Sequence, residues 1–539
     1  MIVLQLVLVF PLALSADEHK LESKEGVVYE TLEWSIENPD HEGNPFGVEA
    51  RAEFQHEESD RTIATPMFYD GQDTWKFRFT AAESGRWRVR TVGGDGDLAG
   101  WSGEVTVAEN DDPGAHGFMR AIDGKWGWQG SGEVFIPQYV DGKDLDAFYD
   151  TDRDEVDEAK IDRNIEEFVD EHGFTGFHLE GRAHWFNVGG DPGEELNPDP
   201  RTYRVLETII RKVHEKGGAC HIWMWGKDGH GGPSDVTGEP MSEADQRNLR
   251  YLAARLGPLP GWSMGYGYDV ENGWATREQL DAWKAYLEEH LGWDHFLGAR
   301  VGYDEKGLYA VSPRPPRPPR DGAYRSPIAD KYTTWLGGDY LGYTSYRPLY
   351  PRYKEVMQHH PDKPSFEEDR FRLRDRPEWG YKDYSPELTR RGLWHSAMAG
   401  GVANIWSNLL PSSAEGGSRP YDNRAEGSFG GTPYVVDIKH QIKTYSRFFE
   451  NRFLPEMQSF YDGPELRLAA PEGEHALVYR EDTGLVRLDL RRMDGSQPAV
   501  AVDTKQDYEE IEIGPLEPGE HTWEAPHRSD WAIAVGAYE

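Results

Sequence analysis

Cysteine is nearly absent from this chain of 539 residues, in which Cys220 is the only one. An intramolecular disulfide framework and a cysteine-rich metal site are therefore excluded. The neighbours Ala219, His221 and Ile222 place this residue in a predicted strand. We expect Cys220 to be a buried structural residue rather than a nucleophile.

Positive charge is also scarce. Lys and Arg number 58 against 96 Asp and Glu, which gives a net charge of −38. This excess of negative charge argues against a nucleic-acid partner and against binding to anionic membrane surfaces. It favours solubility in salty surroundings, but an acidic exported protein from an ordinary habitat has the same composition. Both interpretations stay open.

Long hydrophobic runs are missing after the N-terminus. The segment 1–16 is apolar, ends in small residues and is followed by Asp17 and Glu18. It resembles a secretory signal peptide and is shorter than a membrane-spanning helix needs to be. We therefore expect a signal peptide over 1–16, a secreted or periplasmic location and no membrane insertion.

The chain contains three regions that differ in the periodicity of their hydrophobic residues. Alternating residues separated by turn signals predict a β-sandwich at the N-terminal end, assigned to 25–109. Strands and helices then alternate, so we assign 118–454 to an α/β domain. Short strands return after Pro455, and predict a second β-sandwich over 455–539.

Eight segments of the middle region have the composition of strands, and helical periodicity lies between most of them. The predicted strands are 134–139, 176–180, 219–225, 262–268, 296–301, 340–345, 364–368 and 402–406. The predicted helices are 158–171, 203–216, 243–256, 277–291, 386–399 and 434–451. A glycine-rich dinucleotide turn, which an open sheet would favour, is absent. The predicted fold is thus a (β/α)8 TIM barrel flanked by N-terminal and C-terminal β-sandwich domains.

The strand predicted at 262–268 leads into two acids. In the sequence GWSMGYGYDVEN, residues 261–272, alternation places Gly265, Gly267, Asp269 and Glu271 on one face. Small residues inside a barrel and carboxylates at its carboxyl-terminal mouth are typical of TIM barrel enzymes. This stretch is therefore the first candidate for a catalytic acid.

A second acidic cluster follows the strand predicted at 364–368, where Glu367, Glu368 and Asp369 are consecutive. Glycoside cleavage needs two carboxyl groups. One protonates the leaving oxygen, and the other is a nucleophile about 5 Å away in retaining enzymes or positions water at a greater separation in inverting ones. Alternation places Glu368 with Phe366, and Glu367 with Ser365 and Asp369, although a bulge would rotate this assignment.

Four short motifs carry a resemblance to a known family. GWSMGYGYDVENG (261–273) resembles the fourth-strand pattern of the apiosidase-like glycoside hydrolases, which are barrels related to clan A. HSAMAGGVANIW (395–406) resembles their pattern from helix seven to strand eight. NPF (44–46) and FYDG (68–71) are similar to a domain of unknown function that often precedes such barrels. The C-terminal region is similar to the module that follows them, sometimes labelled collagen-binding.

The resemblance covers nearly the whole chain and implies an acid/base after strand four, a nucleophile after strand seven and no cofactor or metal. The family's Glu-Asn pair matches Glu271 and Asn272, while an extra residue nearby leaves Asp269 as a rival acid/base. The three acids after strand seven do not align uniquely. We predict Glu368 as the nucleophile, ahead of Glu367.

Aromatic and polar residues at the predicted strand ends are candidates for sugar binding, because rings stack on sugars and polar groups bind their hydroxyls. They are His184, Trp185, Trp225, Asn272, Tyr343, Tyr346, Arg370 and Trp406. Each of the aromatic residues could equally belong to the core. Arg370 could hold an anionic sugar or pair with neighbouring carboxylates.

The sequence therefore predicts a secreted glycoside hydrolase that cleaves a plant or algal polysaccharide or oligosaccharide by a two-carboxylate, retaining mechanism. A carbohydrate-binding protein that keeps the barrel cleft without the chemistry is the first alternative. An adhesin that binds collagen through the C-terminal module is the second. Carbohydrate is the expected partner in the first two cases, and the oligomeric state is left open.

Overall fold

The computed structural model describes residues 19–93, 96–142, 145–180, 188, 193–225, 237, 239, 241–267, 270, 275–303, 335–344, 350–370, 386–406, 439–462 and 464–538. The chain divides into two compact units, Met1–Glu109 and Asn110–Glu539. The predicted signal peptide lies outside the described residues. No helix in the described ranges is both long enough and apolar enough to cross a membrane.

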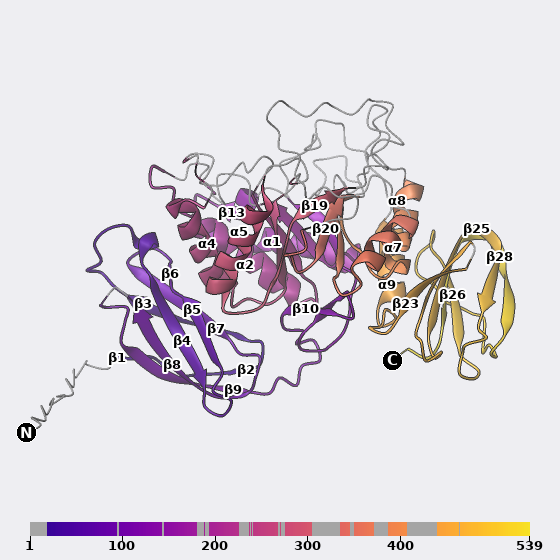
Figure 1. Ribbon diagram of the computed structural model, residues 1–539, viewed down its shortest axis with the longest axis horizontal. Coiled ribbons are helices and arrows are strands. Elements are labelled where there is room, and N and C mark those ends of the chain that lie inside the picture. Colours follow the sequence, from indigo (N-terminus) through magenta and orange to yellow (C-terminus); the bar gives the residue numbers. More distant parts are fainter. Residues whose placement is uncertain are drawn as a thin grey trace, which may run out of the picture. The chain divides into compact units, whose positions relative to one another are not determined.

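The first unit contains two β-sheets that share a core (Figure 1). Phe54 of the larger sheet stacks on Phe79 of the smaller one, with ring centroids 4.1 Å apart. The larger sheet consists of β1 (His19–Lys20), β2 (Lys24–Val27), β4 (Ala50–His56), β5 (Thr62–Pro66), β8 (Gly85–Gly93) and β9 (Trp101–Ala108). The smaller sheet consists of β3 (Thr31–Glu37), β6 (Phe68–Tyr69) and β7 (Thr74–Thr80), and a short helix, η1 (Pro45–Gly47), follows β3.

Eight parallel strands of the second unit form a nearly closed barrel (Figure 1). The first strand pairs with both the second and the eighth, and the fifth is interrupted at Ala299. In order, the strands are β12 (Gln138–Gly142), β15 (Gly176–Glu180), β16 (Cys220–Trp225), β17 (Trp262–Gly267), β18 with β19 (Phe296–Gly298 and Arg300–Tyr303), β20 (Leu341–Thr344), β21 (Ser365–Arg370) and β22 (Ala403–Trp406). The predicted strand positions are therefore confirmed for seven of the eight, within one or two residues at each end.

Helices connect these strands, and their ends follow from local capping. Ser242 forms a capping box with Asp245 before one helix, and Thr276 forms one with Gln279 before the next. Gly292 ends the latter with a left-handed φ of 73°. The helices are α1 (Glu158–Ile165), its π-helical continuation η3 (Glu166–Glu171), α2 (Pro200–His214), α4 (Glu243–Leu256), α5 (Arg277–Leu291), α7 (Tyr350–His359), α8 (Pro386–Met398) and α9 (Lys439–Phe449). A short helix η2 (Leu145–Phe148) and a small hairpin, β13 (Tyr149–Asp150) with β14 (Glu155–Val156), precede α1.

Two features of the barrel differ from the sequence-based prediction. The helix α7 was not predicted, although its Pro351 fits the first turn of a helix. The first barrel strand begins at Gln138 rather than at residue 134. Val134 instead forms a bridge with Gly127 of a hairpin that the prediction missed.

That hairpin, β10 (Met119–Ile122) with β11 (Lys125–Trp128), places Trp126 among interior residues of the barrel. The Trp126 ring lies 5.0 Å from the ring of Phe296 and 5.8 Å from that of Phe366. Its Nε1 donates a hydrogen bond of 3.0 Å to the carbonyl of Ser365, the first residue of β21. The hairpin thus packs against the amino-terminal ends of the strands.

The C-terminal strands form one six-stranded antiparallel sheet in the order β23 (Gln458–Asp462), β24 (Glu465–Ala469), β25 (Ala476–Asp489), β28 (Glu520–Val535), β26 (Ala499–Asp503) and β27 (Ile511–Glu512). Strands β25 and β28 shift register between Arg480 and Leu485. Val478 and Val486, from either side of that shift, belong to the same buried cluster. The two halves of the long strand pair therefore cover one core.

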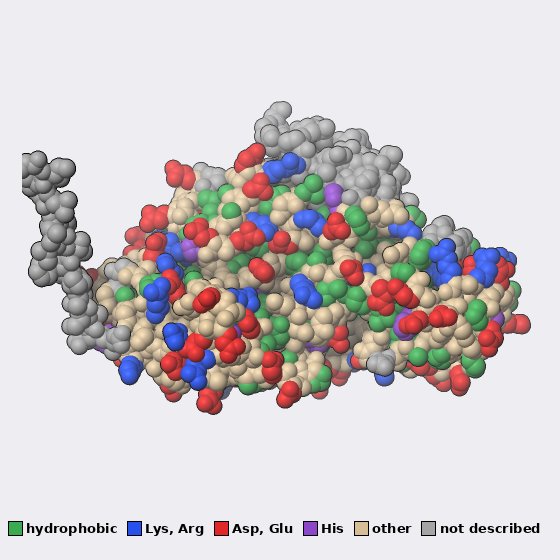
Figure 2. All heavy atoms as spheres, turned by 60° about the horizontal axis from the view of Figure 1, so that its bottom comes forward, with side chains coloured by type: hydrophobic (Ala, Val, Ile, Leu, Met, Phe, Trp, Pro, Cys, Tyr) green, Lys and Arg blue, Asp and Glu red, His purple; other side chains and the backbone are tan. Residues whose placement is uncertain are grey.

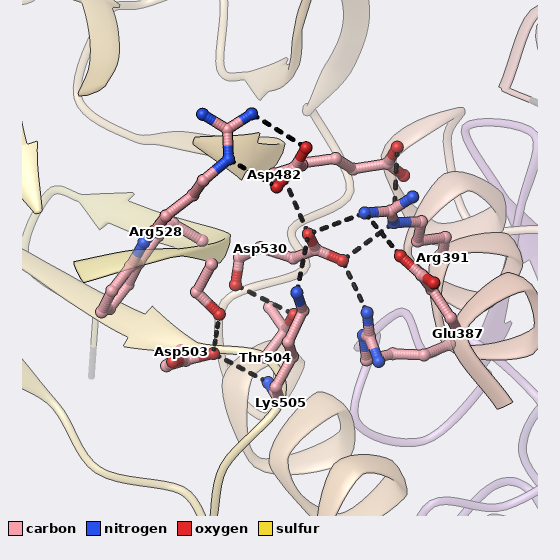
Figure 3. A network of polar contacts seen from close by, with 12 residues as sticks. Glu387, Arg391, Asp482, Asp503, Thr504, Lys505, Arg528 and Asp530 are labelled. Carbon is pink, nitrogen blue, oxygen red and sulfur yellow. Dashed lines mark hydrogen bonds and ion pairs between the residues drawn. The ribbon is translucent and has the colours of Figure 1, made fainter. Parts of the chain in front are cut away.

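Asp530 of β28 connects this sheet to helix α8 (Figure 3). Its fully buried carboxylate accepts hydrogen bonds from Arg390 Nη2 at 2.7 Å, from Arg391 Nε at 2.9 Å and from the backbone of Asp482 at 2.8 Å. Burial raises the pKa of Asp530, but hydrogen bonds from Arg391 and Arg390 outweigh it, so the pKa lies well below its usual range. Because α8 connects β21 to β22, the C-terminal sheet holds a structural helix of the barrel.

On the face of the molecule that Figure 2 shows, the negative charge is not gathered in one patch. Figure 2 shows Asp and Glu side chains distributed over the face in view, with Lys and Arg side chains between them. Many are paired locally, as Glu53 is with Arg51 and Arg90. Such pairs contribute little stability each, so the acidic composition bears mainly on solubility.

Candidate functional site

The interior of the barrel is lined by every second residue of its strands. Phe366 packs against His221, with ring centroids 4.6 Å apart, and against Tyr340 at 5.5 Å. Phe366 therefore points inward, and alternation places Glu368 on the same inner face of β21. His221 and Trp223 are inward-facing residues of β16 for the same reason.

Glu368 is fully buried on this inner face and is surrounded by donors. Trp223 Nε1 donates a hydrogen bond to its carboxylate. Burial and this carboxylate together raise the pKa of the nearby Tyr340 far above its usual value. The Arg300 side chain, 2% exposed, lies 3.4 Å from the carbonyl oxygen of Glu368, and its guanidinium lies 5.2 Å from the Trp223 ring. Because a buried carboxylate is costly without such partners, the arrangement favours a carboxylate that is held in place.

Two buried histidines extend this set of contacts into the barrel. His221 Nε2 lies 3.0 Å from the Tyr340 hydroxyl, and His178 Nδ1 lies 2.9 Å from His221 Nδ1. Burial and the neighbouring His178 keep the pKa of His221 well below its usual value, so its ring is neutral. A polar chain therefore connects β15, β16, the start of β20 and β21.

Three glycines on neighbouring strands make room for these side chains. A β-carbon at Gly265 would lie 2.9 Å from Trp223 Cδ1, and one at Gly342 would lie 2.5 Å from Glu368 Oε1. A β-carbon at Gly298 would overlap the ring of Tyr340. The inner-face position predicted for Gly265 agrees with these contacts.

We expect Gly298→Ala to destabilise the protein by about 1 to 3 kcal/mol, since the added methyl group would displace the Tyr340 ring, which contacts His221 and Phe366. Thermal and denaturant unfolding would measure the change. Gly484→Ala is the matched control, because nothing lies within 4 Å of its added β-carbon. Equal stability of the two variants would contradict the tight packing around Tyr340.

Glu367 and Glu368 lie on opposite faces of β21. Ser365, which shares the face of Glu367, has its hydroxyl 3.2 Å from that of Tyr343. That face lies away from the inward-pointing Phe366, and Glu367 is buried there. Of these two acids, Glu368 is thus the one that lies with the inward-facing polar residues described above. The side chains of Asp369 and Arg370 lie outside the described residues.

Tyr343 and Trp406 were expected at the mouth of the barrel, but both point away from its interior. Trp406 is 1% exposed, donates to Gln138 Oε1 at 3.1 Å and packs against Phe174. Ala403 and Ile405 are the residues of β22 that belong to the interior cluster, so alternation turns Trp406 outward. These contacts favour packing roles for both residues. Trp225 alternates with His221 and Trp223, which places it on the inner face of β16.

The other predicted site residues, Asp269, Glu271, Asn272, His184, Trp185 and Tyr346, lie outside the described residues. The described part of β17 ends at Gly267, two residues before Asp269. The predicted separation of the two catalytic carboxyl groups therefore stays a prediction. Within the described part of the chain, no group of three His, Cys, Asp or Glu side chains could hold a metal ion.

The sequence-based reasoning missed Trp223, Arg300, Tyr340 and the two histidines as neighbours of Glu368. The signal for one strand was present, since His221, Trp223 and Trp225 alternate in CHIWMW. Cys220 is buried in that strand, and burial raises the pKa of its thiol to about 12. Its expected structural role is consistent with that environment.

Comparisons with known proteins agree with this architecture. A family described as a domain of unknown function, DUF5060, matches residues 26–92, as the resemblance of the N-terminal region implied. No curated protein matches the sequence.

Solved structures with the same fold include a candidate glycoside hydrolase from Bacteroides vulgatus, with a TM-score of 0.66 and 14% identity over 96% of this chain and 100% of that chain. A family 5 glycoside hydrolase from the same organism has a TM-score of 0.54 and 14% identity over 80% of this chain and 95% of that chain. A third structure, named a glycoside hydrolase, has a TM-score of 0.52 and 15% identity over 79% of this chain and 98% of that chain. At these identities the likeness shows a shared fold.

Proposed function

We propose that this protein is a secreted glycoside hydrolase that uses two carboxyl groups and retains the configuration of the sugar. One observation carries the proposal: Glu368 is a buried carboxylate on the inner face of the seventh barrel strand, and Trp223 donates a hydrogen bond to it. Catalytic residues of TIM barrels come from the carboxyl-terminal ends of strands. Solved structures that share this fold and are named glycoside hydrolases support the same conclusion.

In this proposal Glu368 is the nucleophile, because the hydrogen bond that Trp223 donates favours its ionised form. Its carboxylate attacks the anomeric carbon and forms a covalent glycosyl ester as the glycosidic bond breaks. Glu271 gives its proton to the leaving oxygen, and then takes a proton from the water that cleaves the ester. The role of Glu271 rests on the sequence motif of strand four.

The substrate of the proposed enzyme is a plant or algal polysaccharide or oligosaccharide. Trp225, on the inner face of β16, is a candidate ring for sugar stacking within the described residues. The proposed location is extracellular or periplasmic, and it rests on the signal-peptide pattern of residues 1–16.

A panel of plant and algal polysaccharides incubated with the purified protein tests this function. We expect release of reducing ends from at least one polymer, and proton NMR of the first product should show the anomeric configuration of the bond that was cleaved. A product of opposite configuration would indicate an inverting mechanism, in which the residue assigned as nucleophile instead acts as a base that activates water. Retention of a sugar on the protein with no cleavage anywhere in the panel would favour the carbohydrate-binding alternative.

A further inference from the structure

Trp223, Arg300 and Glu368 form a closed set of contacts across the interior of the barrel. Trp223 Nε1 donates a hydrogen bond to Glu368 Oε2. The guanidinium carbon of Arg300 lies over the Trp223 ring, 5.2 Å from its centroid, and Arg300 Nη1 donates to the carbonyl oxygen of Glu368 at 3.4 Å. All three residues are buried, and they come from the third, fifth and seventh barrel strands. Each residue therefore contacts both of the others.

The neighbouring strands leave little freedom to the indole and the carboxylate. A β-carbon at Gly265 would lie 2.9 Å from Trp223 Cδ1, and one at Gly342 would lie 2.5 Å from Glu368 Oε1. The backbone of β17 is thus close to one edge of the indole, and that of β20 is close to the second carboxyl oxygen. Packing as well as polarity therefore holds the hydrogen bond between Trp223 and Glu368 in place.

The positive charge of Arg300 strengthens this hydrogen bond. Tryptophan offers the best aromatic ring for a cation, and the attraction grows where water is excluded, as it is around Arg300 and Trp223, which are 2% and 5% exposed. The cation draws electron density away from the indole nitrogen. Because neighbouring polar groups polarise one another, the indole N–H becomes a stronger donor to the carboxylate.

Arg300 also supplies a permanent charge among groups that are neutral. The inward-facing titratable residues described on the neighbouring elements are Tyr139 of β12, His178 of β15, His221 of β16 and Tyr340, which precedes β20. Burial keeps His221 neutral by lowering its pKa, and keeps Tyr139 and Tyr340 protonated by raising theirs. Asp339, beside Tyr340, pairs with Lys284 of α5 at 3.2 Å. Because a buried charge is costly without an opposite one, the guanidinium and an ionised Glu368 favour each other.

We infer that Arg300 is a positioning residue for Glu368, which it holds at two points: at the backbone carbonyl directly, and at the carboxylate through the indole of Trp223. The importance of this arrangement for catalysis rests on the proposed function, but the contacts themselves do not. The planar guanidinium of an arginine can stack on a ring while its edge donates to an oxygen. Lysine keeps the charge but lacks that planar edge.

Nuclear magnetic resonance of the intact protein, isotope-labelled at its tryptophan nitrogens, tests the contacts without a substrate. The indole signal that disappears in Trp223→Phe identifies this residue. We expect its proton to resonate downfield of most other indole protons and to exchange slowly, because it lies in a buried hydrogen bond to a charged acceptor. The signal should move upfield in Glu368→Gln and in Arg300→Gln. A Trp223 indole proton that exchanges as fast as an exposed one would overturn the inference in the wild-type protein itself.

Two further variants show whether the charge is responsible. Arg300→Lys keeps a cation near the ring, so its indole signal should lie between those of the wild type and Arg300→Gln. Arg452→Gln removes a different guanidinium that lies over a ring, 5.6 Å from the centroid of Phe448, and should leave the Trp223 signal unchanged. A signal that moves equally in Arg300→Lys and Arg300→Gln would contradict a role for the charge.

Infrared difference spectra recorded against pH measure the effect of the charge on Glu368. The protonated-carboxyl band that disappears in Glu368→Gln identifies this residue. In Arg300→Gln its titration midpoint should rise by about 1 to 2 pH units, because a positive charge that favours the ionised form is lost. In the Trp223→Phe background the same substitution should cause a smaller rise, because the indole no longer transmits the charge. Equal rises in the two backgrounds would overturn the route through Trp223.

With the polysaccharide identified by the panel, the acidic limb of kcat/KM should shift upward in Arg300→Gln by the same amount as the infrared midpoint, and Arg300→Lys should restore part of the shift. A merely structural role would lower the rate equally at every pH. An unshifted infrared midpoint in a folded Arg300→Gln variant would contradict the positioning role, while failure of the whole panel would contradict the proposed function alone.

Discussion

Glu368→Gln is expected to lower the rate of glycoside cleavage by on the order of 10⁴-fold or more, while the folded protein still binds sugar. Glutamine keeps the shape of the side chain but cannot attack the anomeric carbon. The substitution therefore acts on the transition state far more than on the bound substrate. Initial rates and binding isotherms with the polysaccharide found by the panel would measure the two effects separately.

Azide provides a sharper test of the same residue when its side chain is removed. In Glu368→Ala the small anion can occupy the place of the missing carboxylate, so it should partly restore the rate and give a glycosyl azide of inverted configuration. Glu271→Gln should lose activity for a different reason, since glutamine cannot supply a proton to the leaving oxygen. Rescue of Glu367→Ala by azide, with Glu368→Gln fully active, would move the nucleophile to the neighbouring residue.

Wild-type rates in all of these acid variants would remove the catalytic interpretation altogether. The same holds for a wild-type protein that cleaves nothing in a broad panel but retains a polysaccharide. In that case the barrel would serve as a carbohydrate-binding surface.

The strands and helices of the barrel could be predicted because their signals are local. Both ends of α4 and α5 agree with the prediction, since capping boxes at Ser242 and Thr276 fix where each helix begins. The strand β15 likewise agrees at both ends. The hairpin β10–β11 was missed because what holds it is not local: Trp126 packs on Phe296 and Phe366, far along the chain.

The candidate site was predictable only in the part that depends on alternation within one strand. That rule separates Glu368 from Glu367 on the basis of the sequence alone. The contacts of Glu368 join strands that are distant in sequence. Trp223, for example, precedes it by 145 residues. Closure of the barrel brings Arg300 and Tyr340 to the same point, so no pattern along the chain identifies them. Trp406 was misplaced because a bulky residue at a strand end was taken to face the mouth.

Asp530→Asn is expected to destabilise the second unit by about 3 to 5 kcal/mol, the typical result of removing one partner of a buried ion pair. The substitution leaves Arg390 and Arg391 without the carboxylate that receives both guanidinium groups. Unfolding followed by denaturant titration and calorimetry would measure the loss. The C-terminal sheet should also unfold in a separate transition, at lower denaturant concentration and lower temperature than the rest of the unit, because α8 and β28 meet at this residue.

Asp482→Asn is the matched control within the same network (Figure 3). Its side chain is 61% exposed and pairs with the similarly exposed Arg528. Exposed pairs of this kind contribute little stability, because water and salt screen them. If Asp530→Asn lost no more stability than Asp482→Asn, Asp530 would not be holding the C-terminal sheet to the barrel.

The pH dependence of this contribution has a definite sign. The pKa of Asp530 is lower in the folded protein than the value of about 3.9 for an unfolded aspartate, so the unfolded chain takes up the proton first as the pH falls. The stabilisation is therefore complete above about pH 5 and declines steadily below about pH 4. The difference between wild type and Asp530→Asn should shrink over that acidic range, whereas a purely steric effect of the substitution would stay constant across it.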